Sequence, residues 1–198
     1  MTQQPPIVIE CPECGEKYLI FECQVPFSEQ ALKYTDGYIS DLRAWRTPGI
    51  IGCVTCELGF FPEKGKLVAR PTWDEFSQNW CHLKKAEPPS AGSLAIELRV
   101  RKNMTREIEL TLRRELWYAA NHTENGRLLL EKNARFKAFY LESLQNMQRI
   151  LDETNEEELL VKAEILRQLE QFDMAQNLLQ VHKSSWAEAI KTQCLLQN

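Results

Sequence analysis

Two short stretches, "CPECG" at Cys11–Gly15 and "CVTC" at Cys53–Cys56, decide how the first part of this chain folds. Each contains two cysteines separated by two residues, a spacing that puts both sulfur atoms on one tight turn. Two such turns supply four thiolates, which is the full ligand set of a tetrahedral structural zinc site. The sequence therefore predicts one zinc ion with four protein ligands, Cys11, Cys14, Cys53 and Cys56.

The residues around the cysteines favour this geometry in one turn more than in the other. Pro12 stiffens the first turn, and Gly15 permits a positive φ directly after the second sulfur. That conformation lets backbone N–H groups point at the sulfurs and stabilise their charge. In the second turn Glu57 stands where a glycine would be expected, and Gly59 comes two residues later. We still expect the second turn to form.

Two other uses of paired cysteines are weaker alternatives. A thioredoxin-like redox pair begins a helix after a strand, whereas both pairs here lie between β-like runs. An iron–sulfur cluster also takes four cysteines, but short rigid turns suit a single ion better. A zinc ion closed by four thiolates has no open position for water, so we expect a structural and not a catalytic metal.

Residues 1–86 read as a small β-rich zinc ribbon domain, because this stretch holds most of the proline, glycine and cysteine. A turn is expected at "TDG" (35–37), and residues 58–69 are expected to form a hairpin with its turn at 62–65. Other strands are expected at 6–10, 17–25 and 48–52.

Residues 87–93, within "AEPPSAGS", read as a linker, since Pro cannot continue a helix and Gly and Ser add freedom. Residues 94–198 read as an all-α domain, so the expected fold class is α+β. One helix is indicated by Ile108, Leu112, Leu116 and Ala119/Ala120 and is expected to stop at 123–126. A second is expected over 127–151. Later helices are expected to begin at Asn155 and at Ser184 or Ser185.

"AEILRQLEQFDMAQNLL" (163–179) resembles a tetratricopeptide-type helical hairpin. Phe172 would lie at the turn, and Ala175 would be the small residue where two helices cross closely. Glu170 stands where the family has a glycine. A solenoid needs about three repeats to bury its faces, so we expect a helical bundle with repeat-like hairpins, with or without a groove for a partner.

The remaining cysteines and histidines form no recognisable site. Cys23 and Cys194 are expected to pack as small apolar residues. Cys81 and His82 are adjacent, and on a strand they would point to opposite faces, so we do not expect a second metal site there. No motif of a metalloprotease, serine hydrolase or phosphate-binding loop is present. The acidic pair Asp36 and Asp41 reads as part of a solvated turn.

Composition narrows the classes of function. The chain has 198 residues, 43% of them hydrophobic, and a formal net charge of −4. A protein that neutralises phosphates usually has a basic face, so nucleic-acid binding is disfavoured. No secretory signal and no apolar stretch near the length of a membrane span is present, and we expect a cytoplasmic protein with no membrane contact.

Taken together, "CPECG", "YTDG" (34–37), "CVTC", "RRELWYAAN" (113–121) and the stretch 163–179 are similar to a group of uncharacterised bacterial proteins. These join an N-terminal zinc ribbon of the CP-x-CG type to a helical C-terminal region. The resemblance implies this architecture and no known activity.

The sequence thus predicts a non-enzymatic adaptor with a structural zinc ion and a protein partner. Trp45, Trp73, Trp80 and Tyr118 are candidates for exposed aromatic anchors. A zinc ribbon that binds nucleic acid is the alternative, and an enzyme with an unrecognised cleft is a third hypothesis.

Overall fold

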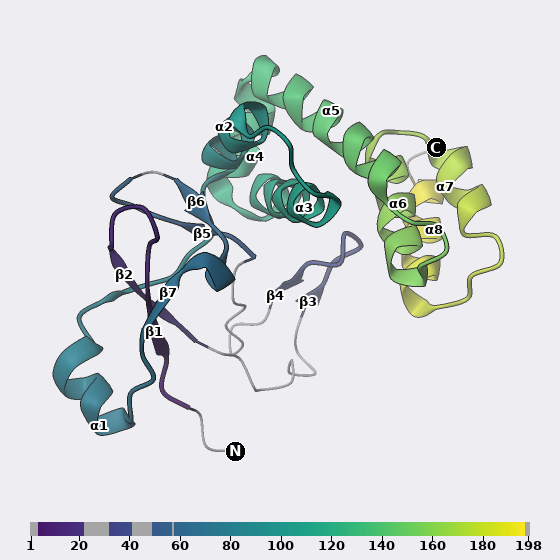
Figure 1. Ribbon diagram of the computed structural model, residues 1–198. Coiled ribbons are helices and arrows are strands. Elements are labelled where there is room, and N and C mark those ends of the chain that lie inside the picture. The colour runs from purple at the N-terminus through teal and green to yellow at the C-terminus, as the bar shows by residue number, and fades with distance from the viewer. Residues whose placement is uncertain (1–3, 22–31, 41–48, 57, 197–198) are drawn as a thin grey trace. The chain divides into compact units, whose positions relative to one another are not determined.

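The computed structural model describes residues 4–21, 32–40, 49–56 and 58–196. The chain forms two compact units, which are treated separately (Figure 1). The first unit is Met1–Ala31 with Asp41–Lys132, and the second is Leu32–Ser40 with Asn133–Asn198. This division does not reproduce the domain boundary predicted at residues 87–93, which stays a prediction. The α+β character is confirmed.

A four-stranded sheet in the first unit carries the first cysteine pair. Its strands, in the order β7-β1-β2-β8, are Lys66–Ala69, Ile7–Glu10, Lys17–Ile20 and Lys84–Lys85. β1 runs antiparallel to β2 and to β7, whereas β8 runs parallel to β2. The strands predicted at 6–10 and 17–25 are present as β1 and β2, but β2 ends at Ile20, and residues 22–25 lie outside the described residues.

A second, two-stranded sheet carries the other cysteine pair. It pairs β5 (Ile51–Gly52) with β6 (Gly59–Phe60). The hairpin predicted over 58–69 is therefore wrong, because β6 and β7 each pair with a different strand. The 3-10 turn η1 (Pro62–Lys64) redirects the chain between them. Lys66 then lies opposite Glu10 of β1 and forms an ion pair with it at 3.0 Å.

An apolar cluster joins these two small sheets. It contains buried residues of β1, β2, β5 and β6, together with two cysteines and Ala86, namely Ile9, Cys11, Tyr18, Ile20, Ile51, Cys53, Phe60 and Ala86. Burial of apolar surface in this cluster stabilises the folded ribbon. The cluster is small, and a small core contributes limited stability to its unit.

The segment predicted as a linker is bonded to the sheets at its start and helical at its end. Ala86 N–H donates to Leu19 O at 2.8 Å, and Gly52 N–H donates to Glu87 O at 2.9 Å. Helix α2 (Ala91–Val100) begins inside the segment, because the Ser90 side chain accepts from Ser93 N–H and caps it. Residues 91–93 of the predicted linker are thus helical, and the linker between two domains stays a prediction.

Helices α3 (Arg106–His122) and α4 (Glu124–Lys132) complete the first unit. α3 buries Leu112 and Leu116 as the spacing predicts. The prediction that a helix ends at 123–126 is confirmed for α3, which ends at His122. Those residues are not a loop, however, because α4 begins at Glu124. Gly126 is needed there for a close approach, because a Cβ at this position would lie 2.0 Å from the Ala119 carbonyl oxygen.

The second unit contains α5 (Ala134–Ile150), α6 (Glu156–Gln168), α7 (Phe172–Leu178) and α8 (Ser185–Leu196). The single helix predicted over 127–151 is wrong: the chain breaks at Asn133, whose side chain caps α5 by accepting from Phe136 N–H.

The capping predictions for the later helices are confirmed. Asn155 accepts from Glu158 N–H at 3.1 Å, and Ser184 accepts from Ala187 N–H at 3.2 Å. The helix pair α6–α7 also forms as expected, with Ala175 fully buried. Glu170, at the position of the missing glycine, adopts a positive φ of 61°. The likeness of this pair to a tetratricopeptide repeat stays a prediction.

Short elements complete the described chain. β3 (Leu32–Lys33) and β4 (Ile39–Ser40) form a hairpin across the expected turn at 35–37. The α1 turn (Trp73–Glu75) leads directly into a π-helix, η2 (Phe76–Trp80). No helix in the described ranges is both long and apolar enough to cross a membrane.

Candidate metal centre

The four cysteines of the two pairs converge on one point of the first unit. Cys11 and Cys14 lie in the turn between β1 and β2, and Cys53 and Cys56 lie in the turn between β5 and β6. All four sulfur atoms lie within 4.8 Å of one another. Between the two turns, the Cys14 sulfur lies 3.4 Å from the Cys53 sulfur, and the Cys11 sulfur lies 3.8 Å from the Cys56 sulfur.

Backbone hydrogen bonds fold both turns in the same way. Gly15 N–H donates to Cys11 O at 3.0 Å, and Cys11 N–H donates to Glu16 O at 2.8 Å. Gly15 has the positive φ that the sequence predicts, 75°. In the second turn Cys53 N–H donates to Leu58 O at 2.9 Å. That turn forms as expected, although Glu57 itself lies outside the described residues.

The sulfur positions fit a single metal ion. Four sulfurs at the zinc–thiolate bond length of about 2.3 Å form a tetrahedron with edges of about 3.8 Å. The observed separations of 3.4 and 3.8 Å are close to these edges and far too long for disulfide bonds. An iron–sulfur cluster would hold the thiolates further apart, because its own iron and sulfide atoms lie between them. The four thiols could therefore hold one metal ion.

Cys53 is the thiol best prepared to be a ligand. Burial alone would raise its pKa, but hydrogen bonds from the Tyr18 hydroxyl and from the backbone N–H groups of Cys56 and Thr55 outweigh burial and lower the pKa to about 6. The Tyr18 oxygen lies 3.3 Å from the Cys53 sulfur. Tyr18 is a residue that the sequence reasoning missed, since a strand pattern does not say what a tyrosine hydroxyl bonds.

Two of the other thiols hold their protons more firmly. Burial raises the pKa of Cys56 to about 12 against a hydrogen bond from Leu58 N–H. A hydrogen bond from Glu16 N–H lowers the pKa of Cys14, but burial and the neighbouring thiols Cys53 and Cys11 raise it overall. A divalent cation at the centre of the four sulfurs would displace these protons, because only thiolates are good ligands.

Cys81 and Cys194 do not belong to this cluster, and among the described residues no second group of potential metal ligands forms around them. Cys194 is fully buried on α8, as predicted. Cys81 is exposed and donates to Ser77 O at 3.2 Å from the end of η2. Cys81 and His82 thus follow a helix and do not lie on a strand, so the strand argument for this pair is wrong. The absence of a second metal site there stays a prediction. Cys23 lies outside the described residues.

The aromatic candidates differ in exposure. Trp73 is 45% exposed, whereas Trp80 and Tyr118 are half-buried, and Trp45 lies outside the described residues. The Lys17 ammonium lies 5.7 Å from the centre of the Trp80 ring, so one face of that indole already contacts a cation of the same chain.

A pocket of about 430 Å³ opens beside the first cysteine turn, between that turn, β6 and α2. Its lining includes three exposed apolar side chains, Leu58 (55%), Ile96 (61%) and Val100 (66%). Arg101, also in the lining, forms an ion pair with Glu97 and lies over the Phe61 ring at 5.8 Å. The pocket is therefore mainly apolar with a paired charge at its edge.

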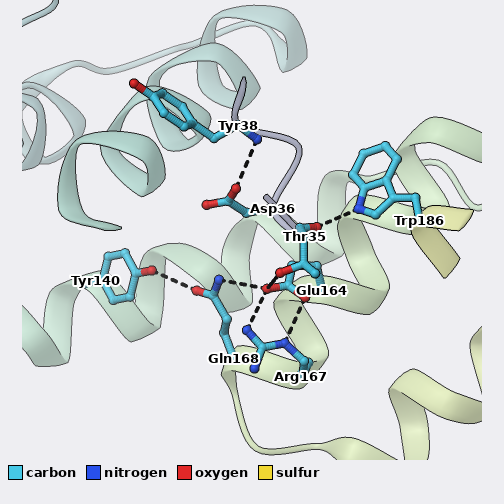
Figure 2. Close-up of polar contacts among 8 residues, drawn as sticks. All are labelled: Thr35, Asp36, Tyr38, Tyr140, Glu164, Arg167, Gln168 and Trp186. Carbon is cyan, nitrogen blue, oxygen red and sulfur yellow. Dashed lines mark hydrogen bonds and ion pairs between the residues drawn. The ribbon is translucent and has the colours of Figure 1, made fainter. Parts of the chain in front are cut away.

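A buried polar cluster in the second unit also escaped the sequence reasoning (Figure 2). The fully buried Glu164 carboxylate on α6 accepts from Arg167, Gln168 and the Thr35 hydroxyl at 2.8–3.1 Å. Trp186 donates its indole N–H to Thr35 O at 2.7 Å. These bonds fasten the β3–β4 hairpin to α6 and α8. The cluster is a structural anchor, because its charges are paired within it.

Asp36 belongs to this hairpin and is only 3% exposed. It accepts from Tyr38 N–H at 3.0 Å. The prediction that Asp36 is a solvated turn residue is therefore wrong. Its part in the turn is confirmed, and Asp36 is the buried residue of that turn, whereas Thr35 and Gly37 are partly exposed. Asp41, its predicted neighbour, lies outside the described residues.

No family model, curated protein or solved structure matches this chain. Of the resemblance drawn from the short motifs, the clustered cysteines and the helical C-terminal region are present in the structure. Membership of the group of bacterial ribbon proteins stays a prediction.

Proposed function

We propose that the four cysteines bind one zinc ion and that this zinc is structural. The observation that carries the proposal is the convergence of the four sulfurs within 4.8 Å of one another. Zinc is the metal that four thiolates in tetrahedral arrangement favour in proteins. With all four positions taken by Cys11, Cys14, Cys53 and Cys56, no position would remain to activate a water molecule.

The place of the site in the fold supports a structural role. The first cysteine pair belongs to the β1–β2 turn and the second to the β5–β6 turn, and these strands lie in different sheets. A metal bound to both turns would crosslink residues 39 to 45 positions apart in the chain. Crosslinks that close long loops stabilise small domains whose own core is limited.

Elemental analysis of the purified chain tests this part of the proposal. We expect about one zinc per chain, and we expect Cys11→Ser and Cys53→Ser to lose the metal together with ribbon stability. Cys81→Ser is the matched control, because Cys81 is exposed and lies outside the cluster. A wild-type protein without metal, or a coloured protein with iron and sulfide, contradicts the proposal.

The second part of the proposal is that the zinc-stabilised unit serves as an adaptor for a protein partner and not as an enzyme. It is supported by the exposed apolar side chains of Leu58, Ile96 and Val100, which gather around one pocket. Apolar surface of this kind, next to polar residues, is common in protein interfaces.

A comparison of two variants tests the adaptor role. We expect a partner that crosslinks to the wild-type chain in its own cells to be lost with Ile96→Asp and kept with Glu63→Ala, which changes an exposed residue of η1. Equal recovery by both variants contradicts the role given to this surface. Nucleic-acid binding is disfavoured, because the net charge is −4 and Lys66, on the ribbon, is paired with Glu10.

A further inference from the structure

The Tyr18 hydroxyl lies between the two cysteine turns and contacts the second. The residue is 1% exposed, on β2 directly after the first turn. Its oxygen accepts a hydrogen bond from Val54 N–H at 3.0 Å and lies 3.3 Å from the Cys53 sulfur. Because an amide N–H can only donate, the hydroxyl uses a lone pair for Val54 and has its own proton free for the sulfur.

Packing alone does not account for a tyrosine at this position. The ring lies against Phe60, with centroids 6.3 Å apart, and belongs to the apolar cluster of the ribbon. A phenylalanine would fill the same space without a polar atom to bury. A buried hydroxyl is costly unless it is hydrogen-bonded, and here both of its bonds go to the second cysteine turn.

Four thiolates around a divalent ion carry two surplus negative charges. At this centre Cys14 is exposed and Cys56 is partly exposed, whereas Cys11 is 2% exposed and Cys53 is 3% exposed, so water can offset little of the charge on the Cys53 sulfur. Hydrogen-bond donors are then the main means of stabilising that sulfur, and partners of this kind also orient the ligands. Tyr18 is such a donor and acts from a rigid strand.

We propose that Tyr18 is a positioning residue of the metal centre: its hydroxyl holds Cys53 in place and withdraws charge from the Cys53 sulfur. The inference rests on the proposed metal binding by the four cysteines. On this proposal Tyr18 raises the affinity of the site for the metal, and it lowers the strength with which the Cys53 sulfur donates electrons to the metal. It also makes Tyr18 a second tie between the two cysteine turns, independent of the metal.

Cobalt loading of the full chain tests the proposal, since the sulfur-to-cobalt charge-transfer absorption reports how strongly the thiolates donate electrons. Without the hydroxyl, the Cys53 sulfur becomes a stronger donor. We therefore expect Tyr18→Phe to move the absorption to lower energy and to weaken metal binding, measured by chelator competition, by about 10–100-fold.

Phe60→Leu is the matched control, because it disturbs the ring packed against Tyr18 and leaves the hydrogen bond intact. We expect it to lower stability without moving the absorption band. If Phe60→Leu shifts the band as much as Tyr18→Phe does, the role of Tyr18 is packing and the proposal is overturned.

A second measurement uses the wild-type chain and needs no variant to fold. The measurement is an NMR experiment on the chain loaded with a cadmium isotope whose nucleus has a spin. We expect a proton–cadmium correlation from the Tyr18 hydroxyl in addition to correlations from backbone N–H groups. Backbone correlations without the hydroxyl one overturn the proposal. A wild-type chain that binds neither cobalt nor cadmium overturns the proposed metal site as well, whereas normal binding with an unchanged Tyr18→Phe spectrum overturns only this inference.

Discussion

Replacing Glu164 by alanine should destabilise the second unit strongly. The side chain is fully buried, and its carboxylate accepts two hydrogen bonds from Arg167, one from Gln168 and one from Thr35. The variant removes the partner of a guanidinium that is itself only 14% exposed. Breaking a buried pair in this way typically costs about 3–5 kcal/mol. We expect about 3 kcal/mol here, because Arg167 has some access to water.

The loss is measured by urea unfolding followed by circular dichroism, which reports the helices of both units, so a local readout of the second unit is needed as well. The Trp186 indole N–H gives a local readout of the hairpin, because Thr35 links it to Glu164. The Thr35 backbone oxygen accepts from Trp186, and the Thr35 hydroxyl donates to Glu164. We expect this proton to exchange faster with solvent in the variant. Faster exchange would place the effect at the hairpin.

Glu188→Ala is the control for this measurement. Glu188 is also a helical glutamate paired with a lysine, at 2.8 Å, but its side chain is 59% exposed. Exposed pairs contribute about 0–1 kcal/mol. The reasoning is refuted if Glu164→Ala costs no more than Glu188→Ala, because the buried cluster would then not anchor the hairpin.

Three further outcomes follow from the geometry. The raised pKa values of Cys14 and Cys56 mean that metal binding releases their protons near neutral pH. Chelator competition should therefore show a metal affinity that rises from pH 7 to pH 8, by about tenfold for each proton released, and falls as the pH falls; an affinity independent of pH would contradict this. Gly126→Ala should lower the stability of the first unit by about 1–3 kcal/mol in thermal unfolding, because the new Cβ meets backbone at 2.0 Å. A fully stable variant would show that α3 and α4 separate freely. Cys81→Ser should leave the melting temperature and metal content unchanged, and loss of metal would mean that Cys81 is a ligand after all.

Local patterns predicted the two cysteine turns well, and the four cysteines cluster in the structure. The spacing of Cys11, Cys14, Cys53 and Cys56 is a property of two short turns, and each turn forms from its own hydrogen bonds. The same holds for the caps at Asn155 and Ser184, which depend on three or four neighbouring residues. In these places nearby residues suffice to determine the structure.

Contacts between distant residues were not predictable in this way. β7 pairs with β1 and not with its neighbour β6, and nothing in residues 58–69 specifies that partner. Gly126 looked like a helix breaker, but its role comes from the Ala119 backbone across a helix junction. Glu164 stands between apolar neighbours on α6, and this was a usable signal of a buried charge. Its partner Thr35 lies 129 residues earlier in the chain, beyond the reach of any local pattern.

X-ray absorption at the zinc edge of the purified full chain tests the central claim most directly, since it counts and identifies the atoms bound to the metal. We expect four sulfur neighbours at about 2.3 Å and no second metal nearby. Nitrogen or oxygen in place of a sulfur would contradict the assignment of Cys11, Cys14, Cys53 and Cys56 as the complete ligand set. A metal–metal distance would contradict the single ion.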